Sequence, residues 1–493
     1  MDILEFATPE EVGVSSLDIS NFIDDIQEQG IMVHSFMIIR HNKVCAECYA
    51  PYFDKDYLHR LYSASKSFSS MALGILVGEG KVKLDDRVSN FFSECLPENI
   101  HEWNKNMTVR DMLMMSSVHS GTPYSIYWDD FFTHTFTAAP NHLSGTVFTY
   151  ETNCTNCICE IVRKVTGKSF LEFLKERALL EIGFSENSSC VEMPQGGAWG
   201  GSGILCTIRD FARFALLVYH DGEANGKQLL PKDYVIEAKS KQIDNSVMGN
   251  QSFIKGHGYG YQIWRLAENG YGFIGLGSQC AMTFPDQDLI FCITADTQGA
   301  SESYPFVAPL KYNIINKIKK FDKSDSLPAN DKAYAELQKK IQAFSLPIPQ
   351  GNKESSFKDV VNDVTYALTD NPMKIKSFSL HFEGDGGICH LDTERGNKDI
   401  PFSLGAYKLY EFPETHYSGD RIHKPLGRGY RAISAGVWRE EHKFAIKTYI
   451  IDKYFGNCYF VFSFKGDMVT LVMRKDAEAF LDEYKGEATG KRV

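Results

Sequence analysis

The sequence predicts an α+β protein in which a long helical insertion interrupts an antiparallel sheet and a second, strand-rich domain follows. Alternating apolar patterns typical of strands occur at 32–40, 44–49, 259–266, 271–284 and 289–295. Helical patterns of period 3.6 fill the stretch between the second and third of these strands. Such an order of strands, helices and strands is typical of the α+β class.

Capping residues and periodicity place the helices in order along the chain. Ser16 precedes an apolar stripe that reaches residue 29, and Thr108 precedes a helix over 109–115. Further helical patterns follow at 150–167, 170–180 and 208–219. The glycine-rich stretch 196–203 cannot belong to a regular element, so its backbone is expected to pass close to another part of the protein.

The composition changes after residue 318, where a polar, proline-marked stretch replaces the alternating elements. We interpret 319–350 as a linker with a short helix, between a domain over 1–318 and a β-rich domain over 351–493. Six short strand patterns beyond the linker predict a small β-barrel or β-sandwich, at 373–382, 387–392, 430–438, 444–451, 459–464 and 468–474.

Charge and cysteine content restrict the classes of partner and compartment. A net charge of −11 over 493 residues argues against nucleic acid or an anionic membrane as the main partner. No run of 18 apolar residues and no leader pattern is visible, so a cytoplasmic protein with reduced thiols is expected. Cys154, Cys157 and Cys159 are closely spaced, but small buried packing residues are favoured there over zinc ligands. No metal and no cofactor is expected.

Ser63 and Lys66 stand at the start of a helical pattern that continues through Phe68 and ends at Gly78 and Gly80. Their spacing of three places both on one face of the helix, one turn apart. A neutral lysine can accept the proton of a serine hydroxyl, and burial beside the positive end of a helix favours the neutral form. Taken by its spacing alone, however, Ser-x-x-Lys more often marks an ordinary solvated helix residue.

Several motifs in the same order resemble the serine β-lactamase and penicillin-binding-protein superfamily, in its branch of esterases, D-aminopeptidases and amide hydrolases. They are Leu61-Tyr62-Ser63-Ala64-Ser65-Lys66-Ser67-Phe68, then 80–86, 108–113, Phe148-Thr149-Tyr150 and 203–214. The resemblance covers roughly residues 5–318. It implies a β-lactamase-like antiparallel sheet flanked by helices.

By this resemblance Ser63 is the acylated nucleophile and Lys66 accepts or relays its proton. Tyr150 matches the tyrosine that passes a proton to the leaving group, although a core aromatic is the simpler interpretation without the family. Gly275 lets a strand approach the substrate, and the N–H groups of Leu276 and Ser63 form the oxyanion hole. The resemblance also implies that Thr152 and Asn153 contact the substrate. Thr152 stands at the third place of the family's Tyr-x-Asn, and Asn153 follows it.

Two departures from the family pattern bear on the substrate. Thr152 replaces the amide of Tyr-x-Asn, and Phe273-Ile274 stands where a cation is usual. Esters or amides without a carboxylate are therefore expected to be preferred over penicillins and cephalosporins.

We interpret the chain as a serine hydrolase that cleaves a small ester or amide through an acyl-enzyme. Two alternatives stay open at this point: a catalytically silent relative that binds a ligand, and an acyltransferase that uses the same acyl-enzyme. The sequence does not indicate an oligomeric state.

Overall fold

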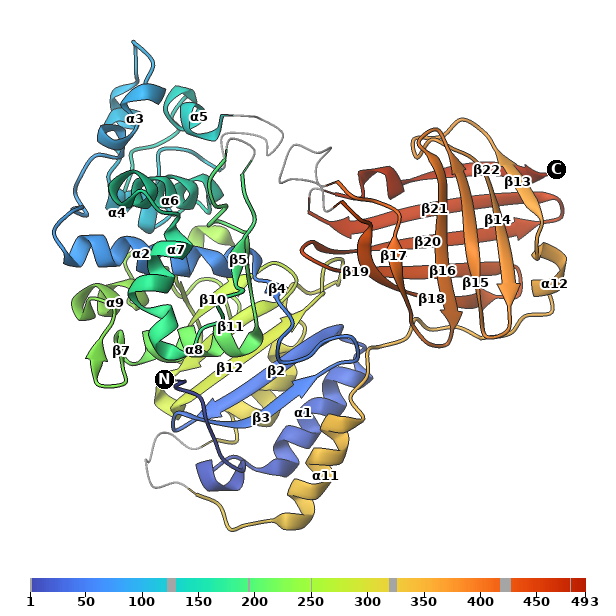
Figure 1. Cartoon of the computed structure of the whole chain (residues 1–493), viewed down its shortest axis with the longest axis horizontal. Helices are drawn as coiled ribbons and strands as arrows, with labels where there is room; N and C mark the ends of the chain where they lie inside the picture. The colour runs from blue at the N-terminus through green and yellow to red at the C-terminus, as the bar shows by residue number, and fades with distance from the viewer. Residues whose placement is uncertain are drawn as a thin grey trace. The chain divides into compact units, whose positions relative to one another are not determined.

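The computed structural model describes residues 2–121, 130–193, 196–249, 251–318, 326–416, 427–478 and 480–493. The chain forms two compact units, Met1–Leu346 and Pro347–Val493, which we describe separately (Figure 1). Residues 319–325, which begin the predicted linker, lie outside the described ranges. None of the helices within these ranges combines the length and apolar character that crossing a membrane requires.

A seven-stranded sheet forms the centre of the first unit, in the order β1-β3-β2-β12-β11-β10-β9. Neighbouring strands are antiparallel except for β1 and β3, which run parallel. The bounds are β1 Glu5–Phe6, β2 Val33–Arg40, β3 Lys43–Tyr49, β9 Trp264–Arg265, β10 Tyr271–Gly275, β11 Gln279–Phe284 and β12 Leu289–Ala295. Strands from the two ends of the unit pair directly, since β2 lies beside β12.

Two helices cover one face of this sheet, and the helical insertion lies against the other (Figure 1). α1 (Ser16–Glu28) packs against α11 (Asp331–Gln342), which the sequence interpretation had placed in a linker. Lys340 of α11 bonds to Asp24, and Leu337 is fully buried. On the opposite face, α8 (Ile208–Tyr219) contacts β2, β11 and β12.

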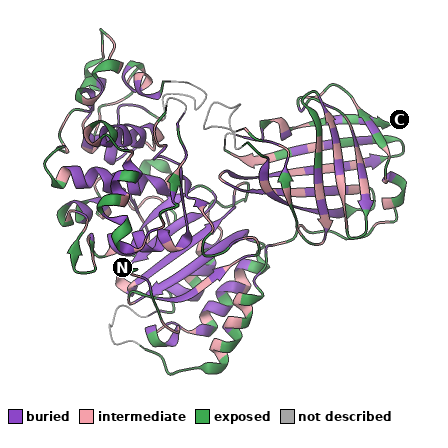
Figure 2. Cartoon of the chain, in the orientation of Figure 1, coloured by how far each residue is buried: buried purple, intermediate pink, exposed green. Residues whose placement is uncertain are grey.

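α2 (Ser65–Gly78) is the central helix of the insertion, and it is buried from Ser65 to Leu76 (Figure 2). It contacts α6, α7, α9 and β10. One of its rings, Phe68, stacks on Phe214 with the centroids 3.6 Å apart. The remaining helices of the insertion are α3 Glu102–Asn106, α4 Val109–Leu113, α5 Phe131–Thr137, α6 Thr152–Thr166, α7 Phe170–Arg177 and α9 Lys232–Lys239. The helix predicted behind the cap Thr108 is confirmed as α4, with a full capping box.

The strand predicted over 271–284 is wrong in one respect, because this stretch is a hairpin of β10 and β11. Gly277 and Ser278 adopt φ values of 72° and 71°, which reverse the chain after Leu276. The strand predicted over 259–266 is also shorter and covers only β9. Gln262 adopts a φ of 61°, which ends extended structure there and turns its side chain into the core.

The second unit is a closed β-barrel, which decides between the barrel and the sandwich. Ten strands follow the order β16-β15-β14-β13-β22-β21-β20-β19-β18-β17, and a pairing of β16 with β18 closes the ring. The strands are β13 Thr365–Leu368, β14 Ile375–Glu383, β15 Gly386–Thr393, β16 Gly396–Leu404, β17 Lys408–Phe412, β18 Tyr430–Glu440, β19 Lys443–Ile451, β20 Phe455–Lys465, β21 Met468–Ala477 and β22 Gly486–Arg492. Its core is aromatic and includes stacked Phe382 and Trp438.

Candidate active site

Ser63 lies in a single 3-10 turn, Tyr62–Ala64, that joins β4 (His59–Arg60) to α2. Its side chain is partly exposed, whereas Lys66 is only 1% exposed. Lys66 Nζ donates to Ser63 Oγ over 3.0 Å and to the carbonyl oxygen of Gly201 over 2.6 Å. The structure therefore places the amine and the hydroxyl in direct contact, as the sequence spacing predicted.

The residue before Ser63 has a strained backbone. Tyr62 adopts a φ of 47°, which costs about 1–3 kcal/mol for a residue other than glycine and persists only where surrounding contacts enforce it. One such contact is with buried Arg60, whose guanidinium lies 4.3 Å from the Tyr62 ring centroid and 5.1 Å from that of Trp199. Arg60 also donates to the backbone and side-chain oxygens of Ser202.

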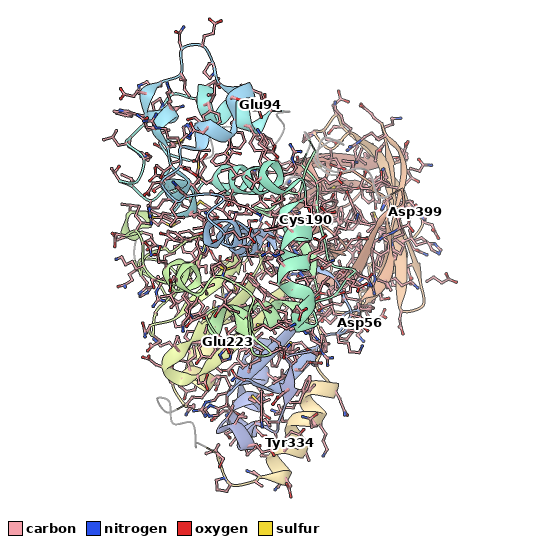
Figure 3. The ribbon with its side chains drawn as sticks, turned by 60° about the vertical axis from the view of Figure 1, so that its left-hand side comes forward. Asp56, Glu94, Cys190, Glu223, Tyr334 and Asp399 are labelled. Carbon is pink, nitrogen blue, oxygen red and sulfur yellow. The ribbon has the colours of Figure 1, made fainter. Side chains whose placement is uncertain are left out.

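The glycine-rich stretch 196–203 packs against α2 and α6, which confirms that its backbone passes close to other parts of the protein. A Cβ atom on Gly200 would lie 2.1 Å from Cys159 Sγ and 2.4 Å from Ser69 Oγ. A Cβ on Gly203 would lie 2.9 Å from the sulfur of Cys190, which Figure 3 labels. Because glycine has no side chain, the backbone can approach α2 closely enough for the Gly201 carbonyl to accept a hydrogen bond from Lys66.

Tyr150 lies just before α6, beside the same serine. Its ring stacks on Trp264 at a centroid distance of 5.3 Å, and Lys66 Nζ lies 5.1 Å from its centroid. Burial raises the pKa of Tyr150 to about 12, although a hydrogen bond with the Ser63 side chain acts in the opposite direction. Tyr150 is therefore a neutral phenol near pH 7.

Gly275 ends β10 directly against the turn that carries Ser63. A Cβ at this position would lie 2.1 Å from the carbonyl oxygen of Leu61 and 3.2 Å from the nitrogen of Ala64. The next residue, Leu276, begins the β10–β11 turn and is 42% exposed. The structure therefore brings the predicted strand end to the predicted nucleophile.

Thr152 and Asn153 have different surroundings. Thr152 is the first residue of α6, and its methyl group would lie 2.6 Å from a Cβ placed on Gly201. Asn153 is fully buried and donates its amide to the carbonyl of Phe131, 3.2 Å away, and to the Thr135 hydroxyl. The structure thus places Thr152 beside Gly201, whose carbonyl accepts from Lys66, and turns Asn153 toward α5 instead.

Sequence reasoning missed two residues that shape the site, Arg60 and Gln262. Gln262 is buried and connects three helices: its Oε1 accepts from Thr155, its Nε2 donates to the Met112 carbonyl, and its own carbonyl accepts from Ser67. Neither residue belongs to a local motif. The only available signal was their polarity within otherwise apolar stretches.

Within the described ranges, one group of side chains has the spacing of metal ligands: Glu414, His416 and Glu483 in the barrel. Lys398 lies 3.0 Å from Glu414, and Arg395 lies 3.6 Å from Glu483. These cations already compensate both carboxylates, so the group forms an ion-pair network. The closely spaced Cys154, Cys157 and Cys159 are all buried in α6.

Comparisons with known proteins agree with this geometry. The beta-lactamase family model matches residues 19–311. A 6-aminohexanoate-dimer hydrolase of Paenarthrobacter ureafaciens is 24% identical over 250 residues, which are 46% of this chain and 63% of that relative. The match thus spans less than two thirds of the relative's own length.

Solved structures share the fold. A family VIII carboxylesterase is 14% identical with a TM-score of 0.53, over 64% of this chain and 100% of the other. A penicillin-binding-protein homologue of Caulobacter crescentus is 15% identical with a TM-score of 0.52, over 63% and 98% of the two chains. The family model covers more than half of the chain, and with the Ser63–Lys66 turn it leads to one conclusion: the chain belongs to the beta-lactamase family.

Proposed function

We propose that this protein is a serine hydrolase that cleaves a linear amide or ester through an acyl-enzyme on Ser63. The observation that carries the proposal is the 3.0 Å contact between Lys66 Nζ and Ser63 Oγ. Tyr150 forms a hydrogen bond to the same serine, so a base and an acid flank one partly exposed hydroxyl. A hydrolase role also agrees with the activities named for the relatives.

In the first step, the Ser63 oxygen attacks the substrate carbonyl carbon while neutral Lys66 takes the hydroxyl proton. The carbonyl π bond breaks and its electron pair becomes the oxyanion. The N–H groups of Ser63 and Leu276 are the proposed donors to this oxygen, because Gly275 holds the strand end against the serine turn.

In the second step, the tetrahedral intermediate collapses and the bond to the leaving group breaks. Tyr150 donates its phenolic proton to the leaving nitrogen or oxygen and regains a proton from protonated Lys66. The raised pKa of Tyr150 keeps the phenol protonated at rest, so in this proposal it donates a proton and Lys66 is the resting base. Water then hydrolyses the acyl-enzyme with the same groups in reversed roles.

The substrate class follows from the site and from the curated relative. The strand end has Phe273-Ile274 where the superfamily usually has a cation, so a carboxylate next to the scissile bond lacks its usual partner there. The relative is named for hydrolysis of a dimer of 6-aminohexanoate. We therefore propose linear amides and esters ahead of β-lactams.

The test is covalent labelling of the full chain by a fluorophosphonate, followed by intact mass and peptide mapping. We expect one adduct, on Ser63, and none in the Ser63→Ala variant. Ser67→Ala is the matched control: its hydroxyl lies in α2, just after the serine turn, and donates to the Gln262 carbonyl, so labelling should persist. A wild-type protein that stays unlabelled and hydrolyses neither esters nor amides would favour a silent binding protein.

A further inference from the structure

The first unit contains a cavity with a volume of about 830 Å³. Its lining comes from residues 248, 251–255, 257 and 267 and from residues 302–304, 307, 308 and 311. Phe253, Ile254 and Val307 provide apolar wall, and Lys255, Lys311 and Tyr304 provide polar groups. A cavity of this size can hold a drug-sized organic molecule.

Tyr304 lines this cavity and interacts electrostatically with Tyr150 of the proposed active site. Its phenol lies near Tyr150 and Cys280, and burial together with these two neighbours raises the pKa of Tyr304. The adjacent Ser303 carbonyl accepts hydrogen bonds from Thr297 Oγ1 at 3.3 Å and from Ser278 Oγ at 3.5 Å. Ser278 ends the turn that begins at Leu276, so the segment that lines the cavity is hydrogen-bonded to the turn that carries the proposed oxyanion-hole donor.

The charged side chains that line the cavity differ in whether they have an ion-pair partner. Lys311 is paired with Glu268 at 3.2 Å. Lys255 is half-buried, and no carboxylate of the described residues lies within ion-pair distance of it. Glu302, the acidic residue of the lining, is exposed at the rim. A half-buried ammonium in an apolar wall favours an anionic ligand group.

We infer that this cavity binds one arm of the substrate, an aliphatic chain that ends in a carboxylate, and that Lys255 anchors this carboxylate. This inference rests on the proposed function, because only a hydrolase would bind this ligand as a substrate. It adds a cation that the strand end lacks, at a position remote from the scissile bond. The apolar wall of Phe253, Ile254 and Val307 would pack against the methylene groups of the chain.

Direct binding tests the inference without turnover. The probe is 6-acetamidohexanoate, a linear amide with a terminal carboxylate, titrated by calorimetry into full-length Ser63→Ala protein. Two matched probes carry a neutral N-methylamide or an ammonium group at the same end. We expect the carboxylate probe to bind about tenfold more tightly than either, which corresponds to ~1.4 kcal/mol.

Substitution of the anchor should remove this preference. In the Ser63→Ala background, Lys255→Met should weaken binding of the carboxylate probe about tenfold and leave the neutral probe within twofold. Lys227→Met is the control, because this lysine lies on the β7–β8 hairpin (β7 Glu223–Ala224, β8 Lys227–Gln228) and pairs with Glu181. Equal binding of all three probes, or an effect of Lys227→Met equal to that of Lys255→Met, would overturn the inference.

Kinetics then separate this inference from the proposed function. With the acetate esters of hexanol and of 6-hydroxyhexanoate, which carry the chain on the same side of the scissile bond as the binding probe, Lys255→Met should raise KM for 6-acetoxyhexanoate and lower its selectivity over hexyl acetate. Acetate ester turnover without such selectivity contradicts the cavity and leaves the hydrolase proposal intact. Selective binding without any labelling of Ser63 contradicts the hydrolase and retains the cavity. Tighter binding of the ammonium probe would assign the anchor to Glu302 and overturn the role of Lys255.

Discussion

Lys66 makes two contacts with its amine, and an arginine at this position could not act in the same way because it cannot lose its proton. Its amine donates to Ser63 Oγ and to the Gly201 carbonyl, and the side chain is almost completely buried. In the proposed mechanism Lys66 is the base, because the phenol of Tyr150 stays neutral near pH 7. The role of Lys66 thus depends on its ability to lose a proton.

We expect Lys66→Arg to slow acylation of Ser63 by about a thousandfold, since a guanidinium stays protonated and cannot accept the serine proton. The measurement is the rate of fluorophosphonate labelling, with thermal melts to verify folding. Lys164→Arg, at a partly exposed lysine on α6, is the control. Labelling of the Lys66→Arg protein near the wild-type rate would show that Lys66 contributes only its positive charge and is not the base.

Gly275 offers a second test at the scale of one residue. A methyl group there would lie 2.1 Å from the Leu61 carbonyl, and a backbone oxygen cannot move aside as a flexible side chain can. Gly275→Ala should therefore push β10 away from the serine turn and misplace the Leu276 N–H. Loss of one oxyanion-hole donor typically costs about 10²–10³ in rate, so we expect a fall in kcat of that order.

Gly121→Ala is the matched control for Gly275→Ala, because a Cβ at Gly121 meets no atom of the described residues within 4 Å. Both variants are compared by kcat on the best ester of a small panel and by melting temperature. If Gly275→Ala kept more than a third of the wild-type kcat, the strand end would not be part of the oxyanion hole.

At the scale of the elements, local patterns explain why the α2 helix was predictable and its surroundings were not. The apolar stripe of α2 and the spacing of Ser63 and Lys66 are features of neighbouring residues. The bond from Ser67 to Gln262 joins residues 195 positions apart, and the bond from Arg60 to Ser202 spans 142 positions. No local period contains such contacts, so these two residues were missed.

The hairpin of β10 and β11 was missed for a related reason. Apolar residues continue from Tyr271 to Phe284, and their alternation favours one long strand. The left-handed φ angles of Gly277 and Ser278 break it, and serine seldom adopts such angles. Likewise, Asn153 seemed suited to a substrate by its distance from Tyr150, whereas the turn of α6 directs it toward α5.

A buried histidine pair links the start of β2 to β4, next to the serine turn. His34 Nδ1 and His59 Nε2 are 2.9 Å apart, and His34 stacks on Phe53. Burial lowers the pKa of His59 to about 3 and also lowers the pKa of His34 well below its usual value. Both rings are therefore neutral in the folded protein at pH values where an unfolded chain protonates them.

The sign of the pH effect follows from this difference. Below about pH 6.5 the unfolded state binds protons that the folded state does not, so the free energy of unfolding decreases as pH falls toward about 3. Each histidine can contribute up to ~1.4 kcal/mol per pH unit in that window. Replacing both rings by His34→Phe and His59→Leu should flatten this part of the stability curve.

Urea unfolding at pH 7.5, 6.5, 5.5 and 4.5 measures the effect as a difference between the double variant and the wild type, because carboxylates titrate in both. His257→Gln is the control for loss of a histidine outside this pair. Parallel stability curves for the double variant and the wild type would show that the pair is not the source of the acid sensitivity.

The whole molecule divides at a different position from the change in composition. The sequence interpretation ended the first domain at residue 318, whereas the compact unit continues to Leu346. The segment between them includes α11 and two further contacts: the Phe344 ring packs edge-on to Phe36 with centroids 6.3 Å apart, and Gln27 bonds to Ser345. A polar surface on α11 hides this role in the sequence, because only Leu337 of the helix is buried.

We therefore expect residues 1–346 to fold without the barrel and to keep a cooperative melting transition, since the unit has its own sheet and core. Residues 1–318 should be markedly less stable. That shorter chain loses the burial of Leu337 and Phe344, and each fully buried side chain of this size is worth about 1.5–3 kcal/mol. The stability of the Leu337→Ala variant of residues 1–346 should fall between those of the two chains, which separates the packing of α11 from chain length.

Calorimetry of the three proteins makes the comparison, with labelling of Ser63 as a second measurement. Equal melting temperatures for 1–318 and 1–346 would mean that α11 adds nothing to the first unit, and insoluble 1–346 would mean that the barrel is required for folding.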